Sequence, residues 1–144
     1  MRDEVLDKYE HISMSDRVTY GRSYKNKIVD TLKNGGVSIA DISNFLWLTL
    51  SVFVSADGRC SKEQYELVCK IWGLTKTSYQ TFYEKTNGGS DPKVVNNYVK
   101  FVGKLNRDAN GFTVSLALFG AIIMAAKGYY TENERKLYKK VLFA

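Results

Sequence analysis

Two stretches of the sequence decide the fold: SIADISNFLWLTLSVFVSADGRCSKEQYELVCKIW at residues 38–72 and DANGFTVSLALFGAIIMAAKGYYTENERKLYKKVL at residues 108–142. A shift of 70 residues aligns them, and Gly58 then coincides with Gly128. Apolar positions coincide as well, among them Ile42 with Phe112, Leu46 with Leu116 and Phe53 with Ile123. Because a shared break glycine and a shared apolar pattern seldom coincide by chance, the alignment predicts an internal duplication with pseudo-repeats at about 38–72 and 108–142.

Each of these units has the pattern of an apolar helix, a glycine turn and an amphipathic helix. Ser61-Lys62-Glu63-Gln64 and Thr131-Glu132-Asn133-Glu134 have the form of capping boxes, in which the first and last side chains satisfy exposed backbone N–H groups. One amphipathic partner cannot cover a helix that is apolar nearly all round. We therefore expect residues 42–53 and 112–123 to pack against each other, with Gly120 allowing a close approach.

Apolar residues at helical spacing predict further helices outside the two units, and no strand alternation is visible. The expected ranges are 3–11, 16–33, 78–85 and 92–105. The predicted fold is an all-α, single-domain helical bundle of about seven to eight helices that covers residues 1–144.

Composition and charge are those of an ordinary globular domain. Of the residues, 44% are apolar and 25% charged. The longest apolar stretches, 45–56 and 112–126, are shorter than the roughly 20 residues of a transmembrane helix. The first ten residues are polar and lack the apolar run of a secretory signal, which favours a cytoplasmic location.

The net charge of +6 is unevenly distributed. Residues 1–72 carry ten basic and ten acidic side chains, whereas residues 73–144 carry eleven and five. A solvated helix surface explains this excess, and so does a patch for nucleic acid or anionic lipid.

Cys60 and Cys69 are separated by a segment that is mostly helical in pattern. At about 1.5 Å per residue they would lie roughly 13 Å apart, too far for a disulfide. We expect two buried thiols.

The two loop segments resemble a known family. Ser55-Ala56-Asp57-Gly58-Arg59-Cys60-Ser61-Lys62-Glu63 and, in the second unit, Ala125-Ala126-Lys127-Gly128 with its capped acidic helix are similar to the repeated signature of TerB-like tellurite-resistance domains. The resemblance covers roughly residues 38–142. It implies an all-helical duplicated bundle, linked to bacterial stress-response systems, that acts as a binding or scaffold module.

The resemblance also implies a divalent cation, bound weakly by acidic residues of the loops. The residues that match are Asp57, Glu63 and Glu66, with Glu132 and Glu134 from the second unit. Lys127 stands where the second aspartate is expected, and an ammonium group there would oppose a cation. Asp57 has a structural alternative, because its carboxylate could instead brace the loop by accepting backbone N–H bonds near Ser61.

Other chemistries fit the sequence poorly. An EF-hand register that places Gly58 at the invariant glycine puts Phe53 at the first ligand and Gln64 at the last, and neither supplies a carboxylate. His11 is the only histidine, which excludes a site with several histidines. We therefore expect a protein that is not an enzyme.

The expected partner is a protein, in solution or at a membrane surface, that contacts the paired loops 57–61 and 127–131. Arg59 and an exposed Tyr129-Tyr130 pair are the predicted contact residues, since arginine and tyrosine are enriched at the centres of interfaces. The alternative is a basic helical domain that binds nucleic acid or anionic lipid through its C-terminal half, with tyrosines as stacking platforms. Tyrosines at helical spacing more often pack against the core, which favours the first prediction.

Overall fold

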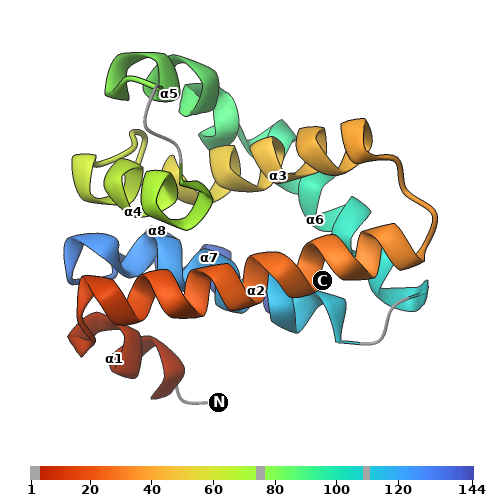
Figure 1. Cartoon of the computed structure of the whole chain (residues 1–144), viewed down its shortest axis with the longest axis horizontal. Helices are drawn as coiled ribbons and strands as arrows, with labels where there is room; N and C mark the ends of the chain where they lie inside the picture. The colour runs from red at the N-terminus through yellow and green to blue at the C-terminus, as the bar shows by residue number, and fades with distance from the viewer. Residues whose placement is uncertain (1–3, 74–76, 109–110) are drawn as a thin grey trace.

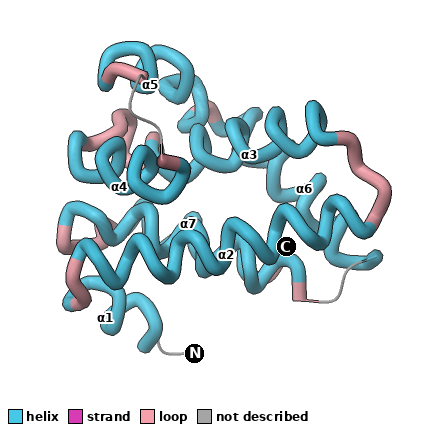
Figure 2. Tube along the Cα trace, in the orientation of Figure 1, coloured by secondary structure: helices cyan, strands magenta, loops and turns pink. Residues whose placement is uncertain are grey.

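The computed structural model describes residues 4–73, 77–108 and 111–144, and every regular element in these ranges is a helix (Figures 1 and 2). The predicted all-α bundle is confirmed. The α-helices are α1 (Glu4–His11), α2 (Met14–Asn34), α3 (Ile39–Val54), α4 (Lys62–Trp72), α5 (Tyr79–Thr86), α6 (Pro92–Asp108), α7 (Phe112–Met124) and α8 (Glu132–Leu142). Two short 3₁₀ helices, η1 (Asn87–Ser90) and η2 (Ala125–Lys127), follow α5 and α7. None of the helices described is both long and apolar enough to cross a membrane.

Local side-chain caps set where most helices begin. A serine or threonine accepts a backbone N–H bond at the start of five of them, and the capping residues are Ser13, Ser38, Ser61, Ser78 and Thr131. The cap at Ser13 starts α2 two residues before the predicted Asp16. Helix α6 continues past the predicted end at Leu105 to Asp108. The predicted start of the first helix, Asp3, lies outside the described residues.

Helix α7 is the centre of the fold. It makes its most extensive contacts with α2 and α8, and it also packs against α3, α4 and α6. In Figure 1, α2, α7 and α8 run alongside one another in the lower half of the molecule, and α3 crosses the upper half. Most side chains of α7 are buried, as expected for a helix without a polar face, and Val114 is the exposed exception.

The two apolar helices touch, as the sequence predicts. A Cβ added at Gly120 of α7 would lie 2.2 Å from the Phe53 ring of α3, so only glycine permits this approach. Nearer the start of α7, the rings of Phe45 and Phe112 lie 6.1 Å apart. Residues 42–53 and 112–123 therefore share one core. The internal duplication itself stays a prediction.

Helix α3 is less enclosed than its apolar sequence predicts. Ile39 is 77% exposed and Leu48 is 36% exposed. The reason is that α7, α5 and η1 cover only part of α3, and the face between α3 and α4 forms an open apolar groove. Of the two apolar helices, α7 is the more enclosed, and Val114 is its one exposed large apolar residue at 45%.

Candidate functional site

The candidate site lies where the loop after α3 meets the loop after α7. Helix α4 contacts η2, so the beginnings of the two capped helices lie near each other. Gly58 and Gly128 both adopt positive φ, at +95° and +92°, a conformation that side chains disfavour. The two break glycines therefore act alike, and each turns the chain from an apolar helix into the cap of the next one.

Both predicted capping boxes are present. In the first, the Gln64 backbone N–H donates to Ser61 Oγ at 3.1 Å and the Ser61 N–H donates to Gln64 Oε1 at 3.0 Å. In the second, Glu134 N–H donates to Thr131 Oγ1 at 3.3 Å and Thr131 N–H donates to Glu134 Oε1 at 3.0 Å. These bonds hold the starts of α4 and α8 in matching geometry.

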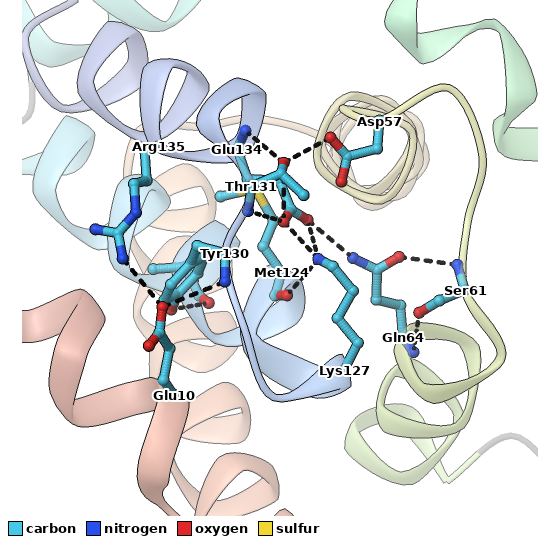
Figure 3. Close-up of polar contacts among 11 residues, drawn as sticks. Glu10, Asp57, Ser61, Gln64, Met124, Lys127, Tyr130, Thr131, Glu134 and Arg135 are labelled. Carbon is cyan, nitrogen blue, oxygen red and sulfur yellow. Dashed lines mark hydrogen bonds and ion pairs between the residues drawn. The ribbon is translucent and has the colours of Figure 1, made fainter.

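Side chains then join the two boxes to each other (Figure 3). The Thr131 hydroxyl donates to Asp57 Oδ1 at 2.6 Å, and the Gln64 amide donates to Glu134 Oε2 at 3.4 Å. Lys127 Nζ donates to the Glu134 carboxylate at 2.5 Å and to the Met124 carbonyl at 3.1 Å. We call Asp57, Gln64, Lys127, Thr131 and Glu134 the inter-loop cluster. It bonds together segments that lie about half the chain apart.

Glu134 is the buried centre of the inter-loop cluster. Its side chain is 2% exposed, and that of Lys127 is 11% exposed. Burial raises the pKa of the Glu134 carboxyl, and the hydrogen bond from Lys127 opposes that rise. A charge buried this deeply requires a partner, and Lys127 supplies it.

The acidic residues do not assemble into a metal site in this geometry. Among the described residues, no group of three or more His, Cys, Asp or Glu side chains is placed to hold a metal ion. Glu63 and Glu66 are exposed on α4, and Asp57 accepts the Thr131 hydroxyl. The Lys127 ammonium already neutralises Glu134. A metal role for Asp57, Glu63 and Glu66 stays a sequence-based prediction, and these contacts argue against it.

The expected bracing role of Asp57 takes a different form. Its carboxylate was expected to accept backbone N–H bonds near Ser61 in its own loop. The contact found is instead with the Thr131 hydroxyl of the other loop. Asp57 therefore links the two units, a role that pattern matching within one unit could not reveal.

The prediction that Tyr129 and Tyr130 are both exposed is wrong for Tyr130. Tyr129 is 56% exposed, but Tyr130 is 8% exposed. The Tyr130 hydroxyl donates to the Ala121 carbonyl at 2.7 Å, and its backbone N–H donates to Glu10 at 3.2 Å. These bonds hold Tyr130 inward, so only Tyr129 faces outward.

Arg59 and Tyr129 border a hollow of about 440 Å³ beside the inter-loop cluster. Arg59 is exposed, and the ammonium of Lys127 lies 5.1 Å from the centre of the Tyr129 ring. The lining also includes Lys62, Glu63 and Tyr79. The surface thus combines charges of both signs with aromatic rings.

Glu10 is a contributor that the sequence did not reveal. Besides Tyr130 N–H, its carboxylate accepts a bond at 3.0 Å from the Arg135 guanidinium of α8 (Figure 3). Helix α1 is thereby attached to the second loop. Glu10 lies outside both pseudo-repeats, so no pattern within them could indicate it.

The cysteines are free thiols, as predicted, but they differ in burial. Cys60 is 1% exposed, whereas Cys69 is only partly buried. Burial raises the pKa of the Cys60 thiol to about 12. Cys60 lines the hollow beside the inter-loop cluster, and its carbonyl accepts the Tyr79 hydroxyl at 2.7 Å.

Comparison with known proteins adds no further constraint. No family model matches the chain, and neither a curated protein nor a solved structure matches it. The functional interpretation therefore depends on the geometry of the inter-loop cluster and its surroundings.

Proposed function

We propose that the protein is a non-enzymatic binding or scaffold module, of the kind that its resemblance to TerB-like domains implies, and that it contacts a protein partner through the paired-loop face. This face comprises residues 57–61 and 127–131 around the hollow beside the inter-loop cluster. The observation that carries the proposal is the pair of bonds from Thr131 to Asp57 and from Gln64 to Glu134, which hold the two loops together.

The contacts favour binding because they organise the loops before any partner arrives. Ordering a loop during association costs free energy, and loops that are already fixed avoid much of that cost. Arg59 and Tyr129 are the exposed side chains on this face with the chemistry of interface hot spots. Tyr129 is further positioned by the Lys127 ammonium near its ring.

The same contacts support a role without catalysis. Lys127 and Glu134 engage each other, and Lys127 also binds the Met124 carbonyl at the end of α7 while Glu134 accepts the Thr131 backbone N–H. A carboxylate occupied in this way supports the loop and is poorly placed to exchange protons with a substrate. His11 is an exposed residue at the end of α1.

Site-specific photo-crosslinking in the source cell tests the proposal. A photoreactive amino acid replaces Arg59 in one variant and Tyr129 in another, and the control variant carries it at exposed Asn97 of α6. We expect the first two variants to capture the same protein and the control not to capture it. Capture of the same proteins by all three variants, or of nothing by the two loop variants, would contradict the proposal.

A second candidate function is binding of nucleic acid or anionic lipid through the C-terminal half. Lys136 and Lys140 of α8 line a hollow of about 270 Å³ together with Ser90 and Val95 from the region where α6 begins. Counterion release predicts that such binding weakens steeply as salt is added. Titration of labelled single-stranded DNA and of anionic vesicles at two salt concentrations distinguishes this candidate. Binding of a protein partner at the paired-loop face should change little between the two salt concentrations.

A further inference from the structure

A second candidate site lies along residues 39–50 of α3, away from the paired loops. An apolar groove of about 310 Å³ runs between α3 and α4. Its walls are formed by Ile42, Leu46 and Leu50, four residues apart on α3, and by Val68 and Trp72 on α4. Ile39, Ser43 and Trp47 also line it, so both tryptophans of the sequence border the groove.

Each tryptophan lies under a lysine. The Lys25 ammonium of α2 is 5.2 Å from the centre of the Trp72 ring, and that of Lys85 of α5 is 4.8 Å from the Trp47 ring. Within the described part of the chain, neither lysine forms an ion pair. One positive charge thus lies against each of the two tryptophans of the apolar groove.

The two borders are not equivalent. Lys25 is partly buried and lies close enough to Arg22 of the same helix for the two charges to repel, and burial together with this repulsion lowers the pKa of Lys25. The Arg22 guanidinium reaches across to the Lys70 carbonyl of α4 at 2.9 Å. Lys85 is exposed, so water and salt screen its charge more than that of the partly buried Lys25. The less screened positive charge is therefore at the Trp72 end.

The size of the groove favours a small ligand over a protein. Its volume is at the lower end of the roughly 300–1,000 Å³ of small-molecule sites. A stable protein interface takes about 20–30 residues a side, far more than the groove offers. The occupant that fits is apolar over most of its length and carries a negative charge at one end.

We propose that the α3–α4 groove binds a single-chain anionic amphiphile of the fatty-acid class, with its alkyl chain along Ile42, Leu46 and Leu50 and its carboxylate at Lys25. Transfer of the alkyl chain from water contributes about 0.8 kcal/mol per buried methylene group and supplies most of the affinity. The Lys25 ammonium selects the charged head group. This site is separate from the paired-loop face and does not depend on the function proposed for it.

Intrinsic tryptophan fluorescence reads this groove directly, because both tryptophans line it. The full-length protein is titrated with decanoate below its micelle concentration, and with decanol as the uncharged probe. We expect a saturable change with decanoate and binding of decanol at least about fivefold weaker. Absence of a saturable response to decanoate, or equal affinity for the two probes, would overturn the proposal.

Three variants locate the site. Lys25→Gln should weaken decanoate binding by about threefold to tenfold and leave decanol binding unchanged. The matched variant Lys85→Gln should change decanoate binding by less than about twofold. Ser43→Phe, at an exposed position that lines the groove, should fill it and abolish binding of both probes while circular dichroism shows an unchanged fold. If Lys25→Gln has no effect, or Ser43→Phe still binds both probes, the assignment is wrong.

A second copy of the chain is the competing occupant. Sedimentation equilibrium distinguishes it, since the proposal expects the protein to have the same mass with and without Ser43→Phe. A dimer that this substitution splits would show that the groove is a self-association surface and would overturn the proposal.

Discussion

The side-chain amide of Gln64 donates a hydrogen bond to the Glu134 carboxylate, with 3.4 Å between Nε2 and Oε2. Both residues occupy the third position of a capped helix, and each also closes the capping box of its own helix. Each side chain therefore does two things at once. It satisfies the start of its own helix, and it links the loop after α3 to the loop after α7.

The two capping hydroxyls should differ in what they contribute to stability. Ser61→Ala removes one cap, which costs about 1 kcal/mol. Thr131→Ala removes a cap and also the bond to Asp57, so we expect a loss of about 2 kcal/mol. Urea denaturation measures both free energies of unfolding. Thr131→Ser keeps the hydroxyl and should stay close to wild type, and equal losses for the two alanine variants would contradict the inter-loop bond.

Glu134 should make stability depend on pH. Because burial raises its pKa above the ordinary 4.5, the folded protein holds a proton that the unfolded chain releases in the range just above that value. The stabilising contribution is thus fully present below pH 4.5 and is lost as the pH rises through the folded-state pKa.

We therefore expect the free energy of unfolding of wild type, relative to Glu134→Gln, to fall as the pH is raised from about 4 to about 7. The glutamine can still close the capping box, as Gln64 does in the first unit. A relative rise over the same range would mean that attraction to Lys127 outweighs burial and that the pKa of Glu134 is lowered.

Two neighbouring glycines of η1 should differ in how strongly a change to alanine destabilises the fold. A Cβ at Gly89 would lie 2.0 Å from the Ser51 carbonyl oxygen of α3, whereas a Cβ at Gly88 meets nothing within 4 Å. Gly89→Ala must push η1 off the α3 backbone, and we expect a loss of about 1–3 kcal/mol or more. Gly88→Ala is the matched control and should be close to neutral in thermal denaturation. Similar melting temperatures for the two variants would show that η1 does not pack this closely.

The two cysteines should differ in reactivity. The Cys60 thiol is buried with its pKa raised to about 12, so almost none of it is the reactive thiolate near neutral pH. Cys69 is only partly buried. Mass spectrometry after iodoacetamide treatment at about pH 8 should find Cys69 modified and Cys60 intact, and both modified in urea. Labelling of both at equal rates without denaturant would contradict the packing around the first loop.

Much of the fold could be read from local sequence signals. Both capping boxes and both break glycines are where the pattern places them, because a cap or a positive φ depends only on a few consecutive residues. The apolar pattern predicted that residues 42–53 and 112–123 touch with Gly120 at a close approach, and the structure shows that the residue packed against Gly120 is Phe53. The start of α2 was misplaced by two residues because Ser13 was not recognised as its cap.

The candidate site was only partly predictable. Arg59 and Tyr129 are exposed on the paired-loop face, but Tyr130 turned inward because Ala121 and Glu10 supply its hydrogen-bond partners from distant parts of the chain. The link between Gln64 and Glu134 could have been suspected, since the 70-residue shift aligns them. Nothing in the local pattern indicated that they touch.

The sequence by itself determined which segments are helical and where they are capped, because these depend on steric and hydrogen-bonding preferences within a few residues. Tertiary structure alone decided that α7 is more enclosed than α3, which borders an open apolar groove, and that Asp57 meets Thr131. The physical reason is that burial and pairing depend on which surfaces compete for the same neighbour. Two helices of similar apolar content can therefore end in different environments.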